Sequence, residues 1–179
     1  MQLLYVLTAL AGAAVVSSAL KCEPYPNGSY EKMYFEECIK NPIVKLNGIT
    51  PVDAEGNYRY PLLVKGVGGL HGTLVNRGPP IKEFYASAKI YARRVLLGCG
   101  WTKLPTFGLL DKINICKYGN CPLKPGVGKL NVKIEFAKYK TIIAFMSTKK
   151  SYQMEVTYKN SATNQVVACA RTQARIVKS

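Results

Sequence analysis

Apolar and polar residues alternate with a period of two along most of the chain, a pattern that predicts β-strands rather than helices. Residues 61–75 are apolar and rich in glycine, which favours a bent or bulged pair of strands. Residues 98–108 show no period and are expected to form a loop, and turn-forming residues fill 53–57 and 160–164. The remaining strand patterns occupy residues 39–50, 109–116, 129–136, 152–158 and 166–177.

Residues 81–97 fit two kinds of element. Their Ala, Lys and Arg content favours an amphipathic helix. Apolar and polar residues also alternate here, with Phe84, Ala86, Ala88, Ile90 and Ala92 on one side. We predict a strand, because the neighbouring segments are strands.

The stretch from Cys116 to Tyr158 is predicted as a hairpin. It contains a short loop that a disulfide would close, a strand, a loop flanked by lysines, and a returning strand. The apolar centre of that loop, 142–146, is either another buried strand or a segment that dips into a membrane. With the other strands, the hairpin predicts an all-β domain of about seven strands in two sheets packed face to face.

The size of the inward-facing residues differs between strands. Two strands place small residues inward (Ala86, Ala88 and Ala92 in one; Ala168, Ala170, Thr172 and Ala174 in the other), whereas the predicted hairpin contributes large ones. Small residues facing large ones form either a filled core or one wall of an apolar cavity. General packing density favours the filled core.

Residues 1–20 are expected to be a secretory signal peptide, because one short apolar run ends in the small residues Ser17-Ser-Ala19. A membrane anchor would need a longer apolar run. The remaining residues, 21–179, are expected to form a single domain. The sequon Asn27-Gly-Ser29 predicts a glycan on Asn27.

An even number of cysteines in a secreted chain suggests three disulfides. Six cysteines allow 15 pairings, and the sequence alone does not choose among them. The cysteines are Cys22, Cys38, Cys99, Cys116, Cys121 and Cys169.

The formal charge of +15 is uneven, since residues 101–179 hold 14 basic and 3 acidic side chains. A positive field favours anionic partners such as acidic lipid headgroups or sulfated glycans, although a merely solvated surface is the simpler explanation. No recognition helix or aromatic platform indicates nucleic acid. The single histidine, His71, has no evident partner for catalysis, and no cysteine spacing predicts a metal site or a cofactor.

Several motifs together resemble the ML lipid-recognition domain family over residues 22–177. Asn120-Cys-Pro-Leu-Lys124 is similar to the central motif of the family, and Cys169 near the start of the last strand is similar to its final cysteine. Cys38 followed by the strand 43–51 is similar to the family's first core cysteine and first strand. The basic, aromatic run from 136 to 152 is most similar to the rim of the family's endotoxin-binding member.

The resemblance implies an immunoglobulin-like β-sandwich whose sheets are splayed around an apolar cavity, with no catalytic residues. It also implies the disulfides Cys38–Cys169 and Cys116–Cys121. These leave Cys22 for Cys99, a bond that departs from the family members compared.

The expected ligand is a lipid, sterol or glycolipid held between the sheets for transport or presentation by a secreted protein, with the lysosome as a second location. The alternative is a cationic extracellular protein with a filled core that recognises a receptor, a glycan or a microbial surface. Two sets of residues are predicted for the site. The pocket set is Phe84, Ala88, Ile90, Ala92, Leu130, Val132, Ile134, Phe136, Phe145, Met154, Val156, Tyr158, Ala170 and Ala174. The rim set, placed for an anionic headgroup or membrane surface, is Tyr118, Lys138, Lys140, Lys149 and Lys150.

Overall fold

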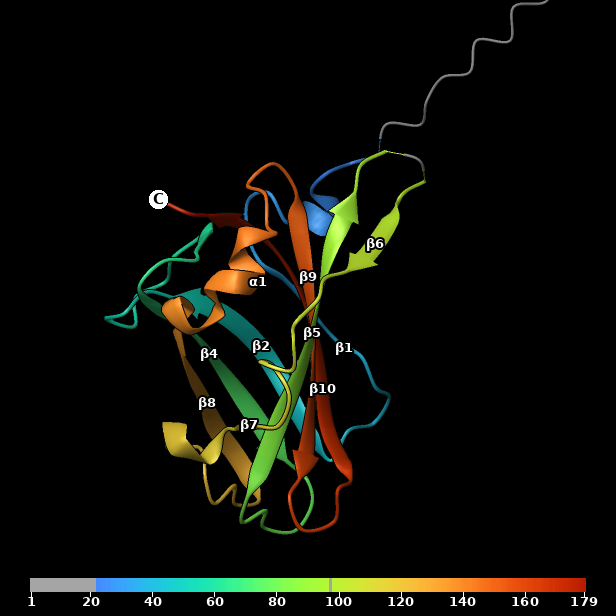
Figure 1. Cartoon of the computed structure of the whole chain (residues 1–179). Coiled ribbons are helices and arrows are strands. Elements are labelled where there is room, and N and C mark those ends of the chain that lie inside the picture. Colours follow the sequence, from blue (N-terminus) through green and yellow to red (C-terminus); the bar gives the residue numbers. More distant parts are fainter. Residues whose placement is uncertain (1–21, 97) are drawn as a thin grey trace, which may run out of the picture.

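A computed structural model describes residues 22–96 and 98–179, which form two antiparallel β-sheets packed face to face (Figure 1). The predicted signal peptide lies outside these residues. None of the helices in the described part of the chain is long and apolar enough to cross a membrane.

The larger sheet has β10 and β9 at its centre, and the smaller sheet has three strands in the order β2-β4-β8. The larger sheet follows the order β1 (Tyr34–Glu37), β10 (Val166–Val177), β9 (Ser151–Asn160), β5 (Phe84–Arg94) and β6 (Gly100–Lys103), with β3 (Leu62–Leu63) beside β10 and β7 (Ile113–Asn114) beside β5. The smaller sheet contains β2 (Val44–Val52), β4 (Val67–Asn76) and β8 (Gly126–Glu135). The short helices are η1 (Pro26–Gly28), η2 (Cys116–Tyr118), η3 (Phe136–Tyr139) and α1 (Lys140–Ala144).

The predicted two-sheet sandwich is therefore confirmed, and the ambiguous segment 81–97 contains strand β5. Its alternation decides the element, because Phe84, Ala86 and Ala88 are buried in the core while Lys89 on the other face is exposed. The glycine-rich segment contains two strands as expected, but β3 joins the larger sheet and β4 the smaller one. Gly72 of β4 faces a bulge in β2, where an added Cβ would lie 2.6 Å from the carbonyl oxygen of Gly48.

The sequence pattern did not predict two of the strands. Residues 100–103, expected to be loop, pair with β5, and Trp101 lies opposite Arg93 with the guanidinium 5.5 Å from the ring centroid. The other is β1, which pairs with the edge of β10 that faces away from β9. Each spans only four residues, too few for a periodic pattern to emerge.

The predicted hairpin is wrong. β8 pairs with β4 in the smaller sheet, whereas β9 pairs with β5 and β10 in the larger one. Helices η3 and α1 connect them at one end of the sandwich (Figure 1). Large and small inward residues are consequently mixed within the larger sheet, where Val156 lies between Ala88 and Ala170. Alternation predicts which face of a strand is buried, but not which strand it pairs with.

The structure contains three disulfides, two of which the family resemblance implies, and the third joins the remaining cysteines, Cys22 and Cys99. Cys38–Cys169 links the end of β1 to β10, and Cys22–Cys99 links the N-terminal segment to the turn between β5 and β6. Cys116–Cys121 closes the loop around η2.

The side chain of Asn120 attaches that loop to the edge of the smaller sheet. It is only 8% exposed. Its amide nitrogen donates to the carbonyl oxygen of Asn131, at 2.8 Å, and to that of Ile115, at 3.1 Å. Its oxygen accepts the N–H of Asn131 at 3.0 Å. Asn120 thus forms with Asn131 the pair of hydrogen bonds that a neighbouring strand would form with edge strand β8.

Replacing Asn120 by alanine should lower the free energy of unfolding by roughly 2 to 4 kcal/mol, because one buried and two part-buried backbone groups lose their partner. Urea unfolding with the disulfides intact measures the loss. Asn114→Ala is the matched control, since Asn114 is exposed and accepts one hydrogen bond from the N–H of Cys116. Equal losses in both variants would contradict a special role for Asn120.

Candidate functional site: an apolar cavity between the sheets

An apolar cavity of about 180 Å³ lies between the two sheets. Inner faces of both sheets line it, and η2, β7 and the segment containing α1 complete its walls. No acidic, histidine or cysteine side chain is among its lining residues, and Lys133 is the single basic one. The arrangement is suited to an apolar ligand rather than to acid–base chemistry.

Most of the predicted pocket residues line this cavity, and the others do not. Phe84, Ala92, Leu130 and Ala170 are buried in the core beside it, while Phe145 is exposed. Those that line the cavity are Ala88, Ile90, Val132, Ile134, Phe136, Met154, Val156, Tyr158 and Ala174.

The lining residues absent from the prediction come mainly from short elements and connections. These segments have no sustained period, so only their general apolar character pointed to burial. Ala86 and Thr172 were expected to face inward but were not assigned to the pocket. The unpredicted residues are Met33, Leu62, Val64, Leu70, Ala86, Leu110, Ile113, Ile115, Lys133, Tyr139, Ile142, Ile143, Met146, Tyr152, Thr172 and Ile176.

A helical turn at α1 covers one end of the cavity. Ile142 is 1% exposed and Met146 is 9% exposed, and both line the cavity. Phe145 is 57% exposed, and its ring centroid is 6.3 Å from that of Phe107. The segment 142–146 is therefore neither a buried strand nor a fully exposed loop. It forms a helical turn, so some of its side chains point into the cavity and others point to solvent.

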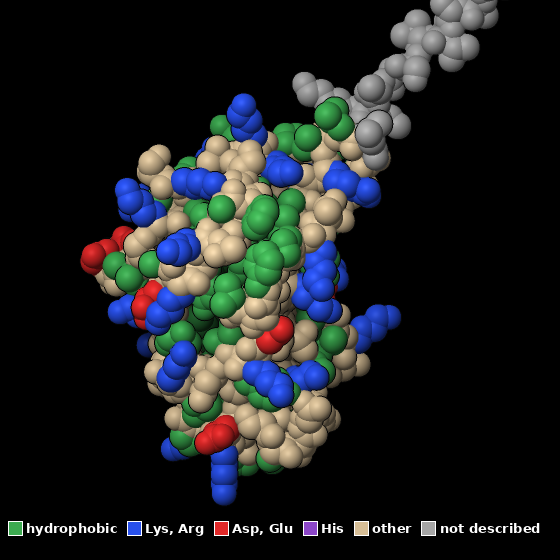
Figure 2. Space-filling view, in the orientation of Figure 1, with side chains coloured by type: hydrophobic (Ala, Val, Ile, Leu, Met, Phe, Trp, Pro, Cys, Tyr) green, Lys and Arg blue, Asp and Glu red, His purple; other side chains and the backbone are tan. Residues whose placement is uncertain are grey.

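The cavity opens between edge strand β8 and the segment that carries β7 and η2. The lining residues on that side include Tyr118, Lys133 and Tyr139, which are half-buried or exposed. Figure 2 shows a band of apolar side chains along this face, with Lys and Arg side chains on both sides of it and few acidic ones. An apolar opening bordered by cations would attract a ligand with an anionic headgroup.

The predicted rim lysines are in different environments. Lys138 forms an ion pair with Glu135 at 2.9 Å, which raises the pKa of Lys138 and lowers that of Glu135. Lys140 and Lys149 are exposed and Lys150 is half-buried. None of these three has an acidic partner within 4 Å among the residues that the structure describes. Tyr118, also assigned to the rim, lines the cavity itself.

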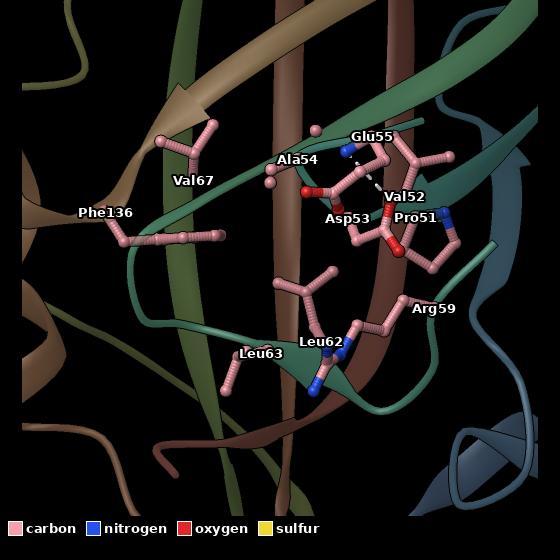
Figure 3. A pocket seen from close by; sticks show the side chains of 12 residues that line it. Pro51, Val52, Asp53, Ala54, Glu55, Arg59, Leu62, Leu63, Val67 and Phe136 are labelled. Atoms are coloured by element: carbon pink, nitrogen blue, oxygen red, sulfur yellow. Dashed lines mark hydrogen bonds between the residues drawn. The ribbon is translucent and has the colours of Figure 1, made fainter. Parts of the chain in front are cut away.

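A smaller pocket of about 120 Å³ adjoins the cavity at the turn 53–57. Figure 3 shows the ring of Phe136 on one side of it and Asp53 and Arg59 on the other. Phe136 and Leu62 line both spaces and so separate them. The ring of Phe136 packs over Gly68, where an added Cβ would lie 3.2 Å from it. A side chain at Gly68 would push this partition into the cavity.

Other candidate residues lie on the outer surface. His71 is exposed in a groove on the far face of the smaller sheet, and the described residues contain no group of His, Cys, Asp and Glu that could hold a metal ion. Asn27 is exposed, and its side-chain nitrogen donates to the side chain of Gln173 at 3.1 Å. A glycan on Asn27 stays a prediction.

The sequence matches no family model and no curated protein. Among solved structures, a Niemann-Pick type C2 protein from the Japanese carpenter ant is similar over 80% of this chain and 99% of that one, with 16% identity and a TM-score of 0.50. The chain described here has the Niemann-Pick type C2 fold. Chicken MD-1 complexed with lipid IVa matches 80% of this chain and 88% of its own, with 16% identity and a TM-score of 0.38.

Both proteins belong to the lipid-recognition family that the sequence resembles. At 16% identity the likeness to the Niemann-Pick type C2 protein concerns the fold alone, and the lower score of MD-1 adds no argument. The shared fold agrees with the two-sheet sandwich described above.

Two tyrosines in the cavity wall differ in their hydrogen bonding. The Tyr152 hydroxyl donates to the carbonyl oxygen of Ser147 at 3.1 Å and accepts the Ser147 N–H. The Tyr158 hydroxyl has no hydrogen-bond partner among the described residues, and burial raises the pKa of Tyr158 to about 12.

Tyr158→Phe should make the protein less sensitive to alkali. The folded state holds Tyr158 neutral, so its contribution to stability is complete below the ordinary pKa near 10 and is lost as pH rises towards 12. From pH 8 to pH 11 the wild type should lose about 1.4 kcal/mol more than the variant. Urea unfolding at both pH values measures this difference. Tyr30→Phe, at an exposed ring, should behave as the wild type does; equal losses in Tyr158→Phe and wild type would refute the effect.

Proposed function

We propose that this is a secreted, non-catalytic lipid-binding protein that holds the apolar part of a lipid, sterol or glycolipid between its two sheets. The observation that carries the proposal is the apolar cavity enclosed by both sheets. Burial contributes about 0.8 kcal/mol per methylene, so ten buried methylenes would contribute about 8 kcal/mol. That free energy corresponds to a micromolar dissociation constant before the costs of binding are counted.

Secretion is supported by the apolar leader at residues 1–20 and by the three disulfides, which are typical of oxidising compartments. The ligand would therefore be met outside the cell or, as the second location, in the lysosome.

The cavity must widen to accept a long chain, because pockets for such ligands generally measure about 300 to 1,000 Å³. The open side favours this movement. Among the described strands, β8 pairs only with β4, and β6 and β7 pair only with β5. The two edges can separate without breaking a strand ladder, and Asn120 holds them together at one place.

The unpaired rim lysines would meet an anionic headgroup or membrane surface, at about 1 kcal/mol per lysine. The exposed rings of Phe107 and Phe145 lie at the same end as α1 and would enter the headgroup layer as the ligand is loaded. The lysines and the two rings would then form one contact surface through which the ligand is transferred from a membrane.

Ala88→Phe should block the cavity. Ala88 is buried on the inner face of β5 and lines the cavity, so a phenyl ring there would occupy the ligand's space. We expect affinity for a fluorescent fatty acid to fall at least tenfold. Displacement titration measures the affinity, and circular dichroism confirms that the variant is folded.

The control is Ala144→Phe, which adds the same ring to an exposed position at the end of α1. It should bind the probe as the wild type does. Undiminished binding by Ala88→Phe would place the ligand elsewhere. If purified wild-type protein carried no lipid and bound no probe, the lipid-binding function would be refuted.

Lys140→Glu combined with Lys149→Glu should weaken binding to vesicles that contain phosphatidylserine by roughly 30-fold or more, since about 1 kcal/mol is lost per lysine. Binding to neutral vesicles should not change. Lys124→Glu with Lys129→Glu makes the same charge change near the other end of β8 and serves as the matched control. Equal losses in the two double variants would indicate net charge rather than a localised rim.

The alternative is a cationic extracellular recognition protein without an internal lipid, acting on a receptor, a glycan or a microbial surface. The net charge of +15 and the rim lysines that have no acidic partner among the described residues favour it. It predicts that Ala88→Phe leaves every binding activity intact, while the double lysine variant loses them.

A further inference from the structure

The wall of the cavity contains a buried tyrosine whose hydroxyl has no hydrogen-bond partner among the described residues. Tyr158 is 6% exposed and lines the cavity from the inner face of β9. Its neighbours on the adjacent strands are Ala86 and Ala168, which have no polar side-chain atoms. The ring lies against Phe84, with 6.4 Å between the centroids.

This hydroxyl lies at the end of the cavity far from α1. Tyr152 and Tyr158 are six residues apart on β9, a distance of about 20 Å along the strand. Tyr152 is at the α1 end, and its hydroxyl is satisfied by Ser147. Ile115, which lines the cavity, and Leu130, which does not, are both 2% exposed. Tyr158 therefore lies in an apolar part of the wall at the level of β7, about 20 Å along β9 from the α1 end.

Thr172 is the other buried residue of the wall whose hydroxyl has no hydrogen-bond partner among the described residues. It lies opposite Met154, and Tyr158 lies opposite Ala168, so the two positions are about 14 Å apart along the sheet. A single oxygen on a ligand can therefore meet only one of them.

We propose that Tyr158 determines specificity by donating its hydroxyl to an oxygen at the buried end of the ligand. The ligand class is a lipid that is apolar along its length and carries a hydroxyl or carbonyl oxygen at its inner end. A sterol inserted with its hydroxyl first and a chain oxygenated near its terminus both fit this description. The inference rests on the proposed lipid-binding function and adds the chemistry of the buried end.

The physical argument concerns the pairing of buried polar groups. A buried hydroxyl left without a partner costs about 1 to 3 kcal/mol. A hydrocarbon end placed against Tyr158 would incur that cost, and an oxygen acceptor would remove it. A site with a buried polar group rejects analogues that lack the matching group.

The test is a double-mutant cycle between ligand and protein. Affinities of wild type and Tyr158→Phe are measured for palmitate and 16-hydroxypalmitate, and for cholestane and cholesterol. In at least one pair, the ratio of affinities for the oxygenated and plain ligand should fall about tenfold or more in the variant. The pair that responds identifies whether a chain or a sterol carries the oxygen. Ratios that stay within about twofold in both pairs would overturn the proposal.

Two further variants make the outcome specific. Tyr152→Phe should keep the preference, because the Tyr152 hydroxyl is already bonded to Ser147, whatever happens to the absolute affinities. Thr172→Val should also keep it. A loss of preference in Thr172→Val but not in Tyr158→Phe would refute the assignment to Tyr158. If wild type binds none of the four probes, the lipid-binding function itself fails; if it binds them without the expected change, only this inference fails.

Discussion

The open edge of strand β8 is the constraint on which the rest of the structure depends. One side of β8 is paired with β4, and the other faces the segment that carries β7 and η2 without a strand ladder. The amide of Asn120 joins the two at Asn131. Because side chains rather than backbone hydrogen bonds close this side, the interior is accessible there and the sandwich can hold a cavity.

The distribution of polarity matches this geometry. The cavity wall is apolar apart from a few hydroxyls and Lys133, and the rim lysines that have no acidic partner among the described residues lie outside it. Apolar burial would provide most of the free energy of binding, while the rim charges would steer and orient an anionic headgroup. The helical turn α1 belongs to both regions, since Ile142 and Met146 line the cavity and Phe145 faces outward.

Much of the fold was predictable, because alternation depends on local chemistry. β5 was assigned correctly from Ala86 and Ala88 alternating with polar neighbours, and the last strand likewise. The disulfide pairs and the presence of a cavity required the family resemblance, since the spacing of cysteines does not determine their partners. The hairpin from 129 to 158 was wrong for a related reason, because strand pairing is a long-range property.

The sequence by itself determined the longer strands, the apolar face that each turns to the core, and the excess of positive charge in the second half of the chain. Each of these follows from residues close together in sequence. The tertiary structure alone decided that β8 and β9 lie in opposite sheets, that Ile142 and Met146 cover one end of the cavity, and that the Tyr158 hydroxyl has no partner among the described residues. These depend on contacts between residues far apart in the chain, for which a local pattern carries no information.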